Sequence, residues 1–388
     1  MQPILPEPGR RYSPPVRFLL SAFGAALLLL ASCGEPTKGV GDPGSVFPGA
    51  MSATPAVLPK AVHVAGRYAV QYELILQNEG TTDIEIRGVV AVNQNGEELE
   101  QLDREEFARR TSLKGGVLPA GERAVLRMVA LADQLEDLET LSHRFQMAPA
   151  GGKDGEKSKA YTVAGGVLKV DGEAPSDFGP PVGPGKWLVQ GPLDPSPGAQ
   201  QTIEEIEGTL VLPRRFQVSL TRLTSDGATS SGSGSANEDY PSFGADVLAM
   251  SGGVVVQVEN GLDDHAPGRP DRSDPVGNFV LVETGTGLYV VYEGLRKGSV
   301  SVRAGDRVSP GARLGAIGNT GLSVEPELRV RLLSAPDVRR ATSLEFGFRT
   351  YRWGGWMEGV PRWDALVSAM GAGAHKGETP PSGSIVQF

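Results

Sequence analysis

Apolar and polar positions alternate along much of the chain from about residue 61, and this pattern predicts short β-strands. Residues 68–76 (YAVQYELIL), 84–92 (IEIRGVVAV) and 124–130 (AVLRMVA) alternate in this way, with Gly- and Asn-containing turns after the first two. Successive side chains of a strand point to opposite faces, so this period is typical of half-buried antiparallel sheets. Residues 60–172 are therefore predicted to form an Ig-like β-sandwich with a short helix within 100–110. This region acts either as a spacer or binding module, or simply as a structural support.

A second strand-rich region extends from residue 205 to residue 335. Residues 277–291 (GNFVLVETGTGLYVV) predict a hairpin about a GTG turn, and residues 328–333 (LRVRLL) form a short alternating run. The intervening residues 173–204 are rich in proline and glycine and are interpreted as a linker. No segment of 205–335 requires a helix, so the predicted fold class is all-β.

The last residues, 336–388, are interpreted as a C-terminal extension that ends in a loose tail over 370–388. Aromatic side chains gather in this extension, and they either pack onto the preceding domain or form a platform for glycans. These aromatic residues are Phe346, Phe348, Tyr351, Trp353, Trp356 and Trp363.

The N-terminal region resembles a bacterial lipoprotein signal. Arginines precede an apolar run of about fourteen residues, 18–31, which is too short to span a bilayer but suits a signal-peptide core. The run ends in small residues before Cys33, the only cysteine of the chain, as in a lipobox. Residues 1–32 are therefore predicted to be a signal peptide and Cys33 the lipidation site. The alternative is an ordinary signal peptide with an incidental cysteine.

Residues 33–59 are rich in glycine and proline and are interpreted as a flexible tether. Several acyl chains on one cysteine anchor a protein stably, so the expected location is the bacterial cell envelope, with the membrane as a partner. Gly34 follows the cysteine where an aspartate often retains lipoproteins in the inner membrane. This favours the outer membrane, facing the periplasm, in a Gram-negative host.

Charge and composition exclude several classes of protein. The net charge is −9, which argues against a nucleic-acid partner. A single cysteine excludes a disulfide within the chain and a zinc site built from several thiolates. The histidines are too far apart in sequence to form an HExxH or HxH pair, although a mononuclear zinc enzyme usually needs two or three histidine ligands. These histidines are His63, His143, His265 and His375.

Five motifs in order make residues 205–335 resemble the LytM/lysostaphin-like zinc endopeptidases of peptidase family M23. Residues 244–255 (GADVLAMSGGVV) are similar to the family's GTPVYAPADGVV strand pair, 277–280 (GNFV) to GNxV, and 291–295 (VYEGL) to the segment that contains YAHL. Residues 305–315 (GDRVSPGARLG) match GDxVxxGxxLG, and 323–330 (SVEPELRV) align with STGPHLHFEV. The resemblance implies a β-barrel-type fold, the duplicated hybrid motif, and zinc-dependent cleavage of peptidoglycan cross-links.

The resemblance also shows which positions hold the family's metal chemistry, and here the ligands are missing. In the family, a His and an Asp of one motif and the second His of HLH bind zinc, while the first His of HLH and the His of YAHL assist water activation. Ser219 aligns with the Asp, a position near Arg214 with its partner His, and Gly294 with the YAHL histidine. Glu327 and Arg329 align with the HLH histidines.

Other candidate ligand sets do not restore a zinc site. Asp246 aligns with a proline of the family, and the register that makes it a ligand places Ser242 at the His position. Glu327 can ligate a metal and His265 lies on a nearby loop, but Arg329 places a permanent cation on the same strand face. No cofactor is therefore expected, although the family binds zinc. Arg329 is expected to replace the charge of the metal and to pair with Glu327 or another carboxylate.

The favoured function is a catalytically inactive M23-like lipoprotein that binds peptidoglycan or regulates a cell-wall hydrolase. The alternatives are an active zinc endopeptidase with relocated ligands and a structural envelope protein. Tyr292 and Asn319 are candidates for contacts in a binding groove; the alternatives are strand packing for Tyr292 and a turn for Asn319.

Overall fold

The computed structural model describes residues 51–111, 113–151, 159–194, 204–206, 209–211 and 213–388. The predicted signal peptide, Cys33 and the first part of the tether lie outside these ranges. The described residues all belong to one compact unit. In the part of the chain that is described, no helix has the length and apolar character needed to cross a membrane.

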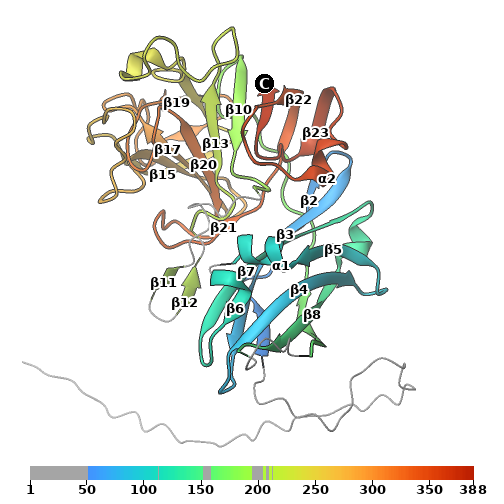
Figure 1. Cartoon of the computed structure of the whole chain (residues 1–388). Helices are drawn as coiled ribbons and strands as arrows, with labels where there is room; N and C mark the ends of the chain where they lie inside the picture. Colours follow the sequence, from blue (N-terminus) through green and yellow to red (C-terminus); the bar gives the residue numbers. More distant parts are fainter. Residues whose placement is uncertain (1–50, 112, 152–158, 195–203, 207–208, 212) are drawn as a thin grey trace, which may run out of the picture. The chain divides into compact units, whose positions relative to one another are not determined.

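The N-terminal region consists of two antiparallel sheets, as the alternating pattern predicts (Figure 1). One sheet contains β1 (Met51–Pro55), β2 (Val62–Val64), β3 (Arg67–Asn78) and β7 (Arg123–Ala132). The other contains β4 (Ile84–Asn93), β5 (Glu98–Asp103), β6 (Val117–Leu118), β8 (Thr140–Pro149) and β9 (Tyr161–Lys169). The inward-facing side chains of both sheets form one buried cluster, which includes Tyr72, Ile86 and Phe145. The all-β prediction is confirmed in this region.

Short helices complete this region. Helix α1 (Arg104–Arg109) lies inside the range predicted for it, and Asp103 caps it by accepting a hydrogen bond from the backbone N–H of Glu106 at 2.8 Å. The 3₁₀ turns η1 (Lys114–Gly116) and η2 (Leu135–Leu138) connect strands. β1 lies within the predicted tether, so that prediction is corrected: Met51–Pro55 pairs along β3 from Asn78 to Leu74.

The C-terminal region is dominated by a single antiparallel sheet of eleven strands. Its order is β18-β15-β16-β17-β20-β13-β10-β24-β22-β23, and β21 pairs with β20. The strands are β10 (Lys186–Gln190), β13 (Val218–Arg222), β15 (Gly253–Glu259), β16 (Asn278–Glu283), β17 (Tyr289–Leu295), β18 (Arg307–Val308), β20 (Leu328–Leu333), β21 (Ser343–Leu344), β22 (Phe348–Trp356), β23 (Gly373–Glu378) and β24 (Ser384–Gln387).

Smaller elements flank this sheet. β14 (Asp246–Leu248) pairs with β19 (Arg313–Ala316), and β11 (Glu204–Ile206) pairs with β12 (Thr209–Val211). The remaining helical turns are η5 (Asn237–Asp239) and α2 (Asp364–Val367). The predicted hairpin about 285–287 is confirmed, because β16 and β17 pair directly on either side of it.

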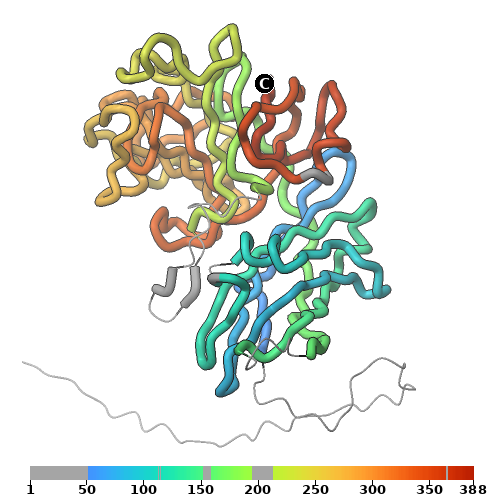
Figure 2. The backbone as a smooth tube through the Cα atoms, viewed as in Figure 1, coloured from blue at the N-terminus to red at the C-terminus, as the bar shows by residue number. Residues whose placement is uncertain are grey.

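Two predicted boundaries are corrected by this sheet. The range 173–204, interpreted as a linker, contains β10, which pairs with β13 on one side and β24 on the other. The extension and tail, 336–388, contribute β22, β23 and β24 to the same sheet. Figure 2 shows the green segment of β10 beside the red C-terminal segment, which is nearly two hundred residues later in the chain.

The eleven-stranded sheet is open, so the expected barrel does not close. Its order begins at β18 and ends at β23, and these two strands do not pair. β20 lies in its middle, between β17 and β13. One face of these three strands carries Tyr292, Val330 and Leu220 into the main buried cluster. The polar side chains of the same strands therefore lie on the other face.

Candidate functional site

The four positions that the M23 motifs single out converge at the middle of the sheet. Ser219 on β13 is the register partner of Arg329 on β20, and Glu293 on β17 is its partner on the other side. A Cβ built on Gly294 would lie 2.9 Å from the carbonyl oxygen of Glu327 and 3.8 Å from Nε of Arg329. Ser219, Gly294, Glu327 and Arg329 therefore form one cluster, which is called the degenerate site below.

Arg329 is the central side chain of the degenerate site and is only 2% exposed. Its Nη1 donates to the carbonyl of Pro275 at 3.3 Å, and its Nη2 donates to the carbonyls of Val276 and Thr320 at 3.0 and 3.2 Å. Nε lies 4.0 Å from Oε1 of Glu327, without a hydrogen bond. The predicted pairing is thus at the limit of an ion pair, and the guanidinium mainly holds backbone of two loops.

Glu327 is largely buried, with 16% of its side chain exposed. Burial raises the pKa of its carboxyl, while the Arg329 cation and a hydrogen bond with Ser219 lower it. Burial also raises the pKa of Glu325, which a hydrogen bond from Thr229 lowers. Burial therefore shifts the pKa of two carboxyls upward: that of Glu327, within the degenerate site, and that of Glu325, two residues before it.

The backbone conformation at position 294 favours glycine over the histidine that the family has there. Its φ is +79°, in the left-handed region that favours glycine. Any Cβ here would also press against the Glu327 carbonyl, at 2.9 Å, and the Ser323 hydroxyl, at 3.2 Å. A histidine at this position would be strained even if the rest of the site could use it.

Tyr292 and Asn319, the candidates for groove contacts, are both fully buried. The Tyr292 hydroxyl accepts a hydrogen bond from the backbone N–H of Met250 at 2.7 Å, and burial raises its pKa. Tyr292 is therefore a packing residue of the main core in this structure. Its ring lies on the opposite face of β17 from the degenerate site.

Asn319 joins three loops, which sequence reasoning did not anticipate. Its Nδ2 donates to Oδ1 of Asn237 at 2.9 Å and to the carbonyl of His265 at 3.1 Å, and its backbone N–H donates to Asp264 at 2.7 Å. His265 in turn is tied by Nε2 to the carbonyl of Gly321 at 3.0 Å, next to Arg329. Asn319 thus makes buried contacts between loops in this structure, and no local motif marked Asn237.

The residues of the degenerate site do not fit a zinc ion. A zinc site needs several carboxylate, imidazole or thiolate ligands. This cluster offers one carboxyl, one hydroxyl, a glycine and a permanent cation within 4.0 Å of that carboxyl. Among the described residues, no group of three or more His, Cys, Asp or Glu side chains is arranged to hold a metal. Asp246 pairs instead with Arg313 at 2.6 Å.

The comparisons with known proteins agree with the fold. Residues 239–337 match the model of Peptidase family M23. No curated protein matches the chain.

Three solved structures are similar to parts of this chain. The catalytic domain of the prophage-encoded M23 protein EnpA from Enterococcus faecalis is 16% identical, with 44% of this chain and 92% of that chain covered and a TM-score of 0.27. The catalytic domain of lysostaphin from Staphylococcus simulans is 21% identical, with coverages of 41% and 86% and a TM-score of 0.23. The SpoIIQ–SpoIIIAH pore-forming complex gives 20% identity, coverages of 43% and 88%, and a TM-score of 0.26.

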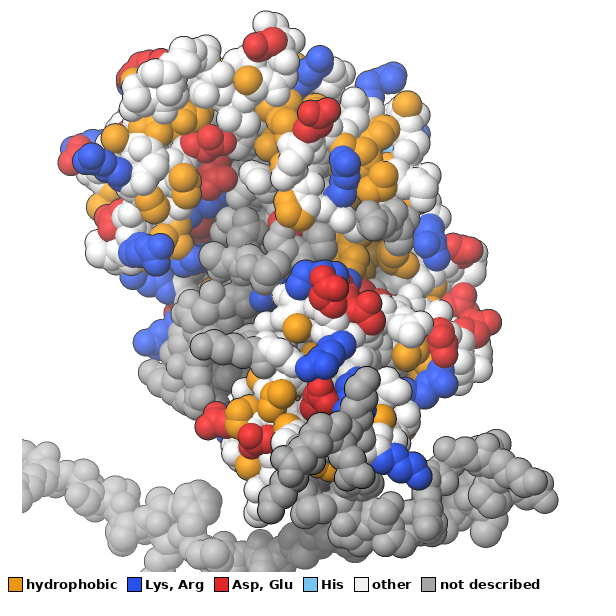
Figure 3. Space-filling model, viewed as in Figure 1, with side chains coloured by type: hydrophobic (Ala, Val, Ile, Leu, Met, Phe, Trp, Pro, Cys, Tyr) orange, Lys and Arg blue, Asp and Glu red, His pale blue; other side chains and the backbone are white. Residues whose placement is uncertain are grey.

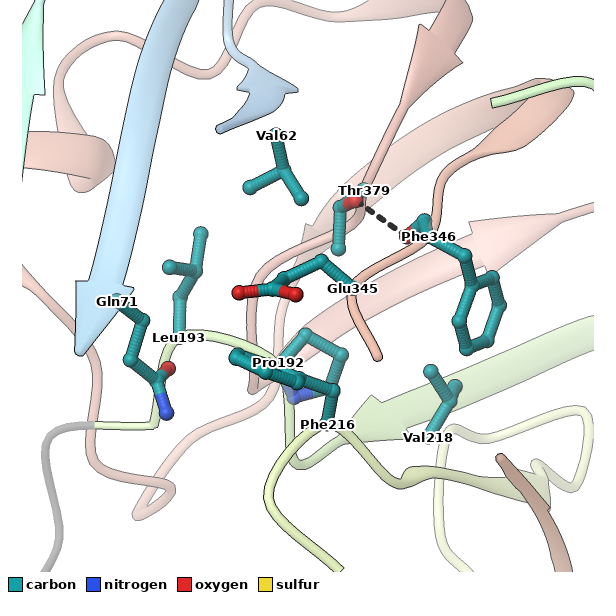
Figure 4. Close-up of a pocket in the computed structure, with 9 residues that line it drawn as sticks. All are labelled: Val62, Gln71, Pro192, Leu193, Phe216, Val218, Glu345, Phe346 and Thr379. Carbon is teal, nitrogen blue, oxygen red and sulfur yellow. Dashed lines mark hydrogen bonds between the residues drawn. The ribbon is translucent and has the colours of Figure 1, made fainter. Parts of the chain in front are cut away.

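The pocket in Figure 4 lies apart from the degenerate site and is too small for a ligand. Its cavity measures about 20 Å³, enough for one water molecule. Its lining is formed by Val62, Gln71, Pro192, Leu193, Phe216, Val218, Glu345, Phe346 and Thr379. The Glu345 carboxyl points into it (Figure 4), and burial raises its pKa to about 7, while Arg215 lowers it.

Glu345→Gln is expected to change how the stability depends on pH. A carboxyl with pKa about 7 when folded and 4.5 in its ordinary state binds more protons in the folded chain between those values. The wild type should therefore lose up to roughly 3 kcal/mol as the pH rises from about 5 to about 7. The variant should match it near pH 5 and be more stable near pH 8 in thermal melts. Equal pH profiles of Glu345→Gln, wild type and the exposed control Glu238→Gln would contradict this.

Proposed function

We propose that this chain is a lipid-anchored protein of the bacterial cell envelope whose M23-type domain is catalytically inactive and acts by binding. The observation that carries the proposal is Arg329, a buried cation tied to three backbone carbonyls. It stands where the motif alignment places a zinc-binding histidine. A divalent cation about 4 Å from a guanidinium is repelled by several kcal/mol even at an effective dielectric constant near 20.

The polar atoms around Arg329 support a binding role. Gln217 Oε1, Ser323 Oγ and Arg329 Nε are buried and have no hydrogen-bond partner among the described residues. Buried polar atoms are normally satisfied, so these three leave hydrogen-bonding capacity unused inside the domain. A partner that carries its own donors and acceptors, such as an amide-rich chain, would reach this capacity only by displacing the segments that cover these atoms. The proposed partners are therefore the peptides of peptidoglycan, or a cell-wall hydrolase that the domain regulates.

The first test is the zinc content of residues 34–388, purified without chelator and without a metal-affinity tag. This fragment contains all of the described residues, which form one compact unit. We expect well below one zinc per molecule by elemental mass spectrometry, and no loss of turbidity when the protein is added to purified sacculi with zinc. An active M23 peptidase handled in parallel is the positive control. One zinc per molecule, with turbidity loss that a chelator abolishes, would replace this proposal by an active endopeptidase.

Binding is measured separately from catalysis. The same fragment is expected to sediment with sacculi, or to crosslink to a hydrolase in envelope extracts. Sedimentation with sacculi identifies peptidoglycan as the partner, and crosslinking without it identifies the hydrolase. The absence of both would reject the binding role.

A further inference from the structure

An arginine-lined cavity of about 230 Å³ lies close to the degenerate site but does not include its side chains. Its lining consists of Arg214, Arg331, Arg339 and Arg340 together with two prolines and two valines. No acidic side chain lines it among the described residues. The arginines come from three places: the approach to β13, the strand β20, and the connection from β20 to β21.

Arg331 forms a fixed, buried part of this arginine cavity. Its Nε donates to the Glu293 carboxylate at 2.8 Å, and its Nη2 donates to the same carboxylate and to the carbonyl of Val338 at 2.8 Å. Its Nη1 donates to the carbonyl of Pro213 at 2.6 Å. These four bonds leave one of the five guanidinium N–H groups, on Nη1. The side chain is thus held in place before any ligand arrives.

The outer arginines are presented by an ordered turn. The Asp337 carboxylate accepts hydrogen bonds from the backbone N–H groups of Arg339 and Arg340, at 2.9 and 3.0 Å. Arg339 has a 58% exposed side chain and pairs with Asp274 at 2.9 Å. In Figure 3, Lys and Arg side chains gather at the edge of the molecule where Figure 1 shows the connection between β20 and β21.

We propose that the arginine cavity is a binding site for a small multivalent oxyanion, with carboxylate or phosphate groups. Guanidinium groups match both, because their planar fork donates two parallel hydrogen bonds to an oxyanion. This volume of about 230 Å³ is more than ten times that of the pocket in Figure 4, which holds about one water molecule, and it accommodates a diphosphate or a di- or tricarboxylate. The apolar prolines and valines limit hydration of the bound charges. The site does not depend on the proposed function of the degenerate site.

The test is calorimetric titration of residues 34–388 with inorganic pyrophosphate and, separately, with citrate, at low ionic strength. We expect saturable binding that weakens when salt is added. The variant Arg339→Gln/Arg340→Gln is expected to bind at least about tenfold more weakly, because it loses two charge-assisted contacts. Both side chains are exposed, so the variant should keep the wild-type melting temperature. The matched control is Arg313→Gln, an exposed arginine that also pairs with an aspartate but lies outside the cavity.

Each outcome decides the proposal. Binding of pyrophosphate alone assigns the site to phosphate groups, binding of citrate alone to carboxylates, and binding of both to multivalent oxyanions in general; all three support it. Absence of saturable binding to either probe overturns it. Undiminished binding by the double variant, or an equal loss in Arg313→Gln, also overturns it.

Discussion

Arg215→Ala is expected to destabilise the folded chain by about 3–5 kcal/mol near neutral pH, because it leaves a buried carboxylate without its partner. Arg215 Nε lies 2.6 Å from Glu73 Oε2, and both side chains are almost completely buried. Its Nη2 also donates to the carbonyl of Gln71 at 2.6 Å. Burial raises the pKa of Glu73 and Arg215 lowers it, so removal of the cation should raise it further. Urea denaturation followed by tryptophan fluorescence measures the loss.

Two control variants test whether the loss of stability comes from burial of the ion pair. Arg313→Ala removes an exposed partner of Asp246 and should cost less than about 1 kcal/mol. The double variant Arg215→Met/Glu73→Met removes both charges and should recover most of the stability lost in Arg215→Ala. If Arg215→Ala costs no more than Arg313→Ala, the pair does not hold these segments together as the structure indicates.

Arg329→Met is expected to cost about 3 kcal/mol and to loosen the two loops that the guanidinium connects. The carbonyls of Pro275, Val276 and Thr320 would lose their donor. Hydrogen exchange should accelerate in residues 275–278 and 320–322, and the thermal melting temperature should fall. Both effects follow from backbone acceptors that remain buried without partners.

The variant Arg329→Lys separates charge from geometry at the same position. An ammonium keeps the positive charge but cannot reach three carbonyls at once, so Arg329→Lys should recover only part of the stability. Full recovery would mean that charge alone matters. Unchanged exchange in Arg329→Met would mean that the loops are held by other contacts.

The sequence carried most of the information on the individual strands. Alternation over 84–92 and 328–333 located β4 and β20, because side-chain direction in a strand follows from the backbone alone. The order and spacing of the M23 motifs singled out Ser219, Gly294, Glu327 and Arg329, which the structure brings together. The contacts of Arg329 could not be predicted from the sequence. Its acceptors are backbone carbonyls, and these leave no mark in residue type.

Strand partners were the main features that the sequence did not reveal. β10 is only five residues long and lies in a proline- and glycine-rich stretch. The local sequence pattern is therefore typical of a linker. The partner strand β24 lies in what was interpreted as a tail. Their pairing brings Trp187 opposite Val386, and both side chains pack in the main core. Contacts between residues so distant in the chain are not visible in a local window.

The amino-acid sequence by itself thus determined the all-β class and the strands with clear alternation, and its resemblance to family M23 singled out four positions that the structure brings together. Only the tertiary structure decided that the large sheet stays open, that Tyr292 packs inward, and that four arginines from three segments line one cavity. The physical reason is the sequence separation over which the interactions act. Periodicity and turn chemistry act between neighbouring residues, whereas sheet order, ion-pair partners and cavities arise from contacts between residues that are distant in the chain.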